Sequence, residues 1–194
     1  MSSHDVDYLR LLKRVSDSDD IRIKEIIKKR LLKNEDIIHI LNNKSLEESE
    51  AEPSDYFNVN IFPYYIIDDT QTNVENYICY ETGYTAVDNG NDVYKYGQIT
   101  FYVLCDIKNL VEPETGICRH DLLGALLLEE FNWSNFFGTQ IKCVADKSGV
   151  TDDDYAMRTL IFEMVTPNNI TRTGRQSHVT RIVNNGPRSI RDGH

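Results

Sequence analysis

The segment Gln98 to Ile107 (QITFYVLCDI), with Arg119 to Phe131 (RHDLLGALLLEEF) after it, decides the fold. In the first segment every second residue from Ile99 to Ile107 is apolar, and Thr100 and Asp106 break the other face. This period of two predicts a half-buried β-strand. In the second segment the leucines instead fall on one stripe of a helix. They are Leu122, Leu123, Leu126 and Leu127.

The flanking sequence predicts further strands around this pair. Thr139 to Ala145 and Tyr155 to Thr166 alternate again, and Asn76 to Thr82 is rich in β-formers. Phe57 to Ile67 is also β-prone but contains Pro63, which cannot donate to a ladder, so this strand belongs at an edge or carries a bulge. We therefore expect an α+β fold, with a mixed or antiparallel curved sheet of about five strands and one packed amphipathic helix.

The N-terminal part differs in character from the sheet region. Residues 1–46 are predicted to form short helices, the second starting within residues 16–20 and the third, Ile37 to Leu41, capped by the Asn34 to Asp36 segment. Residues 47–56 are acidic and contain a proline, which indicates a linker. The sequence thus divides into a helical region (1–46), a linker (47–56), a domain (57–168) and an extended C-terminal tail (169–194).

Charge is unevenly distributed along the 194 residues, whose formal net charge is −10. Residues 49–170 hold six Lys/Arg and twenty Asp/Glu, whereas residues 171–194 hold five Arg and one Asp. An acidic surface gives no electrostatic grip on a duplex. The acidic surface either keeps the protein soluble or lets nucleic acid pass without binding. The four cysteines form no Cys-x-x-Cys pair and are expected to be reduced core residues.

Neither an export signal nor a membrane span is expected, because the N-terminus lacks an apolar core and no apolar run is long enough. Nucleotide-binding loops and hydrolase motifs are also missing from the sequence. We expect no enzyme activity, no cofactor and no metal. Trp133, which follows the amphipathic helix, is expected to fill the core.

Two groups of residues offer chemistry that the sequence alone does not establish. Asp146 and Asp152 to Asp154 (Asp152, Asp153, Asp154) could bind a divalent cation, but Lys147 opposes a cation and a polar hairpin explains the segment better. His120 could act as a base beside Asp121, but adjacent residues at a helix start are expected to point apart. Asp121 is better explained as a favourable charge at a helix N-terminus.

Two segments are candidates for contact with other molecules. The first is a polar hairpin tip that contains Asp88, Asn89, Gly90 and Asn91. We expect a loop of this length to be partly exposed, so that it could reach a neighbouring subunit or a lumen. The C-terminal tail is too poor in apolar area to fold alone, and its spaced aliphatic residues favour ordering against a partner; these include Val179, Ile182 and Val183.

The order of the motifs resembles that of bacteriophage tail-terminator (tail-completion) proteins. The matching pieces run from Phe57 to Asn168. They are Ile61-Phe-Pro-Tyr, the strand Ile99 to Val103, Gly-x-x-Arg-His-Asp-Leu-Leu from Gly116, Phe137-Gly138, and Asp153-Asp-Tyr-x-x-Arg158. The resemblance implies a protomer that closes into a ring, in many relatives a hexamer, which ends the tail tube and joins it to the head-side connector while DNA passes through.

This resemblance also implies partners, a location and interface residues. We expect a homo-oligomer, contacts with tail-tube and portal-side proteins, DNA only in transit, and no membrane. The protein would belong to the virion and be assembled in the host cytoplasm. Interface candidates are Pro63, Asp88, Asn89, Gly90, Asn91, Arg119, Arg158, Val179, Ile182 and Val183.

Three alternatives stay open at this point. Because residues 1–44 and 171–194 lie outside the recognised pattern, the protein could be a head–tail adaptor or a ring protein of a short-tailed phage. A metal-dependent hydrolase using Asp146 and Asp152 to Asp154 is a second alternative. A third is a host-directed regulator that binds a partner through the C-terminal tail.

Overall fold

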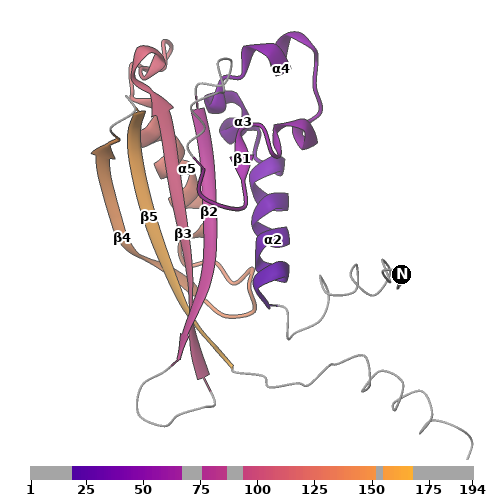
Figure 1. Cartoon of the computed structure of the whole chain (residues 1–194), viewed down its shortest axis with the longest axis vertical. Helices are drawn as coiled ribbons and strands as arrows, with labels where there is room; N and C mark the ends of the chain where they lie inside the picture. Colours follow the sequence, from indigo (N-terminus) through magenta and orange to yellow (C-terminus); the bar gives the residue numbers. More distant parts are fainter. Residues whose placement is uncertain (1–18, 67–75, 87–93, 152–154, 168–194) are drawn as a thin grey trace, which may run out of the picture.

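A computed structural model describes residues 19–66, 76–86, 94–151 and 155–167 (Figure 1). A five-stranded sheet and a set of helices form an α+β fold, as the sequence predicted. Within these ranges no helix is both long and apolar enough to span a bilayer. The elements in chain order are α2 (Asp19–Lys33), α3 (Glu35–Leu41), α4 (Lys44–Glu48), η3 (Pro53–Tyr56), β1 (Ile61–Phe62), β2 (Asn76–Ala86), β3 (Tyr94–Asp106), η4 (Ile107–Asn109), α5 (Arg119–Phe131), β4 (Ile141–Val150) and β5 (Tyr155–Pro167).

The sheet is mixed, with strand order β1-β2-β3-β5-β4. Strands β2, β3, β5 and β4 pair antiparallel, and only β1 runs parallel to its neighbour β2. The registers place Phe101 opposite Tyr80 on one side and opposite Leu160 on the other. The centre of the sheet is therefore the strand that the sequence pattern identified most clearly.

The alternation in β3 sends its odd-numbered side chains into the core. Ile99, Phe101, Val103 and Cys105 are fully buried. Phe101 stacks on Phe131 of α5 with ring centroids 5.1 Å apart. Helix α5 has the bounds predicted from the sequence, and it lies behind the sheet in Figure 1. The predicted pairing of an amphipathic helix with a half-buried strand is confirmed.

Helices α2 and α3 join the same core. Ile23, Ile27 and Leu31 of α2 are buried together with the sheet residues. Asn34 caps α3, because its side chain accepts a hydrogen bond from the Ile37 backbone N–H. The opposite face of the sheet carries a smaller buried cluster built on Phe62, Tyr77, Cys79 and Leu104. Among the described residues the helical layer therefore covers one face of the sheet.

A buried asparagine network joins the N-terminal helices to the sheet. Asn43 Nδ2 donates to Asn60 Oδ1 (2.8 Å), and Asn60 Nδ2 donates to the Asn76 carbonyl (2.9 Å). Asn76 Nδ2 in turn donates to the Leu41 carbonyl at the end of α3 (3.0 Å). Buried polar groups need such partners, so this chain of bonds fixes the position of α3 against the start of β2.

The region around Pro63 differs from the predicted strand Phe57 to Ile67. Among the described residues of this segment, to Ile66, only Ile61–Phe62 form a strand; it pairs with Ile78 and Cys79 of β2 and ends directly before Pro63. The expectation of an edge position holds, but the length was wrong. The predicted linker 47–56 contains the end of α4 and the short helix η3, whose Tyr56 is buried in the core. The domain divisions stay a prediction.

Candidate functional site

The lower end of the sheet in Figure 1 extends beyond the helices. Tyr80 and Thr82 of β2 still contact α2, through the Lys24 carbonyl and the Asp20 carboxylate, and Asp20 is only the second residue of α2. On the helix-facing side of the sheet, Tyr84 farther along β2 still packs against the main core cluster, and Met164 of β5 is buried in it. We call Gly83–Ala86, Tyr94–Gln98 and Glu163–Pro167 the arm.

The arm exposes large apolar side chains. Tyr94, Tyr96 and Val165 are 46%, 44% and 48% exposed, and Tyr96 pairs with Val165 across β3 and β5. On the opposite face, the Lys95 ammonium lies 4.0 Å from the centre of the Tyr84 ring. Exposed aromatic side chains on a projecting element are typical of surfaces that another protein covers.

The edge strand β4 is the second surface available for contact. The outward-facing backbone groups of its first residues already form hydrogen bonds with the loop after α5. The Trp133 N–H donates to the Ile141 carbonyl (2.8 Å), and the Cys143 N–H donates to Asn132 Oδ1 (2.9 Å). A bulge lies between Cys143 and Ala145, and the following residues to Val150 are mostly exposed. Unpaired edge groups can accept a strand from another chain.

The loop after α5 overturns one expectation. Trp133 does not fill the core: it is 61% exposed and has a φ of 62°, in the left-handed region. The bulky residue that is buried in this loop is Phe137, while Phe136 lies under the Arg30 guanidinium at 3.9 Å. Sequence reasoning chose Trp133 because it follows the amphipathic helix, but the turn that ends α5 points its side chain outward.

In a comparison with protein-family models, the model YomW matches residues 34–164, which is more than half of the chain. The chain belongs to the YomW family. YomW is a Bacillus phage-associated family. No curated protein matches the sequence. The YomW match runs from the cap of α3 to near the end of β5, so it includes both the arm residues of β3 and the edge strand β4.

Arg158, an interface candidate in the YomW region, bonds within the chain. It donates to both oxygens of Asp146, from Nε (2.8 Å) and from Nη2 (2.7 Å), and its Nη1 donates to Asp121 Oδ1 (3.0 Å). These hydrogen bonds, more than the charge itself, lower the pKa of Asp146 below its usual value. Of the four aspartates that could bind a cation, Asp146 is therefore already paired with an arginine of the same chain. The other three, Asp152 to Asp154, lie outside the described residues.

Arg119, the other arginine candidate, is buried. Its Nη1 donates to the Ile40 carbonyl at the C-terminal end of α3 (3.2 Å). A cation suits the negative end of a helix, so Arg119 holds α3 against the start of α5. His120 and Asp121 beside it do not point apart as expected, because His120 Nε2 lies 3.6 Å from Asp121 Oδ1.

Pro63 is half-buried at the β1 edge. The other interface candidates lie outside the described residues. They are Asp88, Asn89, Gly90, Asn91, Val179, Ile182 and Val183. Sequence reasoning missed the exposed tyrosines of the arm, although Tyr94 and Tyr96 continue the alternation of β3 towards its start. That continuing alternation was the signal that could have found them.

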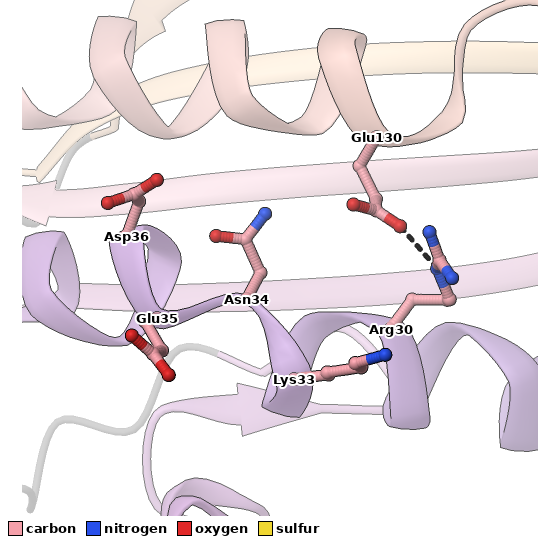
Figure 2. Close-up of a pocket in the computed structure, with 6 residues that line it drawn as sticks. All are labelled: Arg30, Lys33, Asn34, Glu35, Asp36 and Glu130. Carbon is pink, nitrogen blue, oxygen red and sulfur yellow. Dashed lines mark hydrogen bonds and ion pairs between the residues drawn. The ribbon is translucent and has the colours of Figure 1, made fainter.

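An open depression lies where α2 and α3 meet the end of α5 (Figure 2). Its volume is about 370 Å³, and an ion pair between Arg30 and Glu130 crosses one side of it. Lys33, Asn34, Glu35 and Asp36 complete the wall. The lining mixes both signs of charge and offers no nucleophile beside a base, so it does not support a catalytic reading of this site.

Proposed function

We propose that this YomW-family protein is a structural subunit of a phage neck, where copies form a closed ring. The ring would end the tail tube and join it to the head-side connector, with DNA passing through its centre. The family's association with Bacillus phages supports a phage role. The order of motifs that resembles tail terminators supports the specific position in the particle.

The arm is the observation that carries this proposal. Two tyrosines and a valine, each more than 40% exposed, lie at one end of the sheet on the face opposite the helical layer, the face that Tyr102 and Leu104 share. Covering such side chains removes apolar area from water, and full burial of one is worth roughly 1.5–3 kcal/mol. A neighbouring subunit would supply that cover.

The arm and the β4 edge are different surfaces, which favours a ring over an isolated dimer. The arm lies at the end of the sheet where Tyr94 pairs with Pro167, and the exposed part of β4 lies towards the other end, where Val150 pairs with Ala156. A contact in which one surface of a subunit meets another surface of its neighbour is heterologous. Repeating it closes a ring when the rotation closes.

Charge supports the passage of DNA. Residues 49–170 carry twenty Asp/Glu and six Lys/Arg, so the ring wall would be acidic. A channel with a basic wall would retain the polyanion through its phosphates, whereas an acidic wall repels it. Other ring positions in the neck, such as a head–tail adaptor, would use the same two surfaces and differ in their neighbours.

The mass of the assembled protein tests the ring. We expect full-length protein, measured by native mass spectrometry over a range of concentrations, to give one discrete closed oligomer. Tyr94→Ser with Tyr96→Ser should shift it to monomer while the far-UV circular dichroism spectrum of the folded subunit stays unchanged. Tyr64→Ser is the matched control, because Tyr64 is equally exposed at 47% but lies outside the arm.

Purified particles provide the second measurement. We expect the protein in the neck fraction of virions, and we expect the arm variant to yield heads and tails that do not join. A wild-type protein that stays monomeric at every concentration and is absent from particles would refute the proposal. An arm variant that assembles like the wild type would refute the role of the arm.

A further inference from the structure

Three potential metal ligands meet at the start of α5. One ligand atom each from Cys118, His120 and Asp121 lies within 4.8 Å of the other two. Cys118 is the N-cap residue of α5, yet its side chain makes no capping hydrogen bond. His120 Nδ1 is buried and has no hydrogen-bond partner. The Cys118 thiol is therefore not used as a helix cap, and one ring nitrogen of His120 lacks the partner that a buried polar atom normally has.

We propose that Cys118, His120 and Asp121 bind a zinc ion. Thiolate, imidazole and carboxylate together are the donor set that zinc takes, whereas Ca²⁺ and Mg²⁺ prefer oxygen ligands alone. Three protein ligands leave the fourth tetrahedral position for a water molecule. His120 Nε2, which lies 3.6 Å from Asp121 Oδ1, is the nitrogen placed to bind this metal.

The local charges are compatible with a dication. Asp121 Oδ1, which lies 3.6 Å from His120 Nε2, also accepts a hydrogen bond from Arg158, and a carboxylate has lone pairs enough for both a metal and this bond. The guanidinium of Arg158 is itself neutralised by Asp146, through two bonds of 2.8 and 2.7 Å. A zinc ion with one thiolate and one carboxylate forms a neutral group, so the site needs no further acid.

Cobalt(II) is the probe that tests this site, because it adopts the zinc geometry and gives a charge-transfer band when a thiolate binds it. We expect the reduced, metal-free, full-length protein to bind one equivalent of Co²⁺ with this band. One equivalent of Zn²⁺ should then abolish the band. No band, or one that Zn²⁺ does not remove, would overturn the proposal.

Variants separate the loss of metal from the loss of folding. Cys118→Ser removes the thiolate but places a preferred capping residue at the start of α5, so the apo protein should remain folded. Its zinc affinity should fall at least about 100-fold, since changes even beyond the direct ligands cost 10–100-fold. His120→Ala should lower zinc affinity by a similar factor.

Cys143→Ser is the matched control, because Cys143 is also a partly exposed free cysteine but lies outside the cluster. We expect it to keep the band and the wild-type affinity. Wild-type zinc affinity in Cys118→Ser or His120→Ala would overturn the proposal. The site does not depend on ring formation, so the oligomer measurements and the cobalt titration can fail separately.

Discussion

Gly124 of α5 lies against the side chain of Arg158. Substitution of Gly124 by alanine tests whether the close packing of Arg158 at this position stabilises the fold. A Cβ atom at Gly124 would lie 2.6 Å from Arg158 Cδ, 2.7 Å from Nε and 2.9 Å from Cζ. These atoms cannot simply swing away, because Nε and Nη2 hold Asp146 and Nη1 holds Asp121. We therefore expect Gly124→Ala to displace Arg158 and to break part of this network.

The size of the effect follows from two opposing contributions. Alanine in place of glycine in a helix interior contributes about 1 kcal/mol of stability. Against this, losing the contacts of Arg158 with two partly exposed carboxylates costs about 1 kcal/mol each, and the steric displacement costs about 1 kcal/mol more. The free energy of unfolding should fall by about 2 kcal/mol, which lowers the melting temperature by about 4–8 °C.

A double-mutant cycle with Arg158→Ala separates the contributions. Arg158→Ala removes the three atoms nearest to the new methyl group, so Gly124→Ala should stabilise that variant by about 1 kcal/mol. Urea unfolding followed by far-UV circular dichroism measures all four proteins; Trp133, the only tryptophan, is already exposed and reports little. Equal stabilisation by Gly124→Ala with and without Arg158 would refute the reasoning.

Three further predictions concern single residues. Arg158 holds the pKa of Asp146 below its usual value of about 4, so this stabilisation is present above about pH 4 and is lost as the pH falls through the lowered pKa. Asp146→Asn should therefore flatten the acid limb of a stability curve from thermal melts, and an unchanged limb would contradict this. Asn60→Ala leaves buried polar partners unsatisfied and should lower the free energy of unfolding by about 2 kcal/mol; a change below about 0.5 kcal/mol in urea unfolding argues against the network. Trp133→Gly relieves a left-handed backbone at an exposed residue, so urea unfolding should show unchanged stability or a gain of up to about 1 kcal/mol. A clear loss would show that Trp133 packs more than its exposure suggests.

The elements with local causes were predictable from the sequence. Helix α5 begins at Arg119 and ends at Phe131 as predicted, because its leucine stripe and its flanking polar residues are read within one segment. The cap at Asn34 is equally local, since its side chain bonds to a backbone group three residues away. Strand β3 was recognised for the same reason.

Features that depend on distant partners were not predictable. Strand β1 is short because only Ile61 and Phe62 find partners in β2, a pairing that no local pattern encodes. The burial of Arg119 depends on the free carbonyl of Ile40, far away in sequence. The contact of His120 with Asp121, and the closeness of Cys118 to both, likewise depend on how the chain enters α5.

The distribution of the core explains why assembly can be tested without unfolding the subunit. Helices α2, α3 and α5 share one buried cluster with the middle of the sheet, and Asn60 and Asn76 hold the N-terminal helices to it. The exposed tyrosines of the arm lie on the opposite face of the sheet, so their removal forfeits little buried area within the chain. A substitution there should change the oligomer mass, remove the dependence of the melting temperature on protein concentration and leave the far-UV spectrum unchanged. A core substitution such as Phe101→Ala should instead destabilise the subunit itself, at a cost of about 3–5 kcal/mol. An arm variant that loses assembly because its subunit is unfolded, as judged by the far-UV spectrum, would place the arm inside the subunit's own core and remove the basis for the ring.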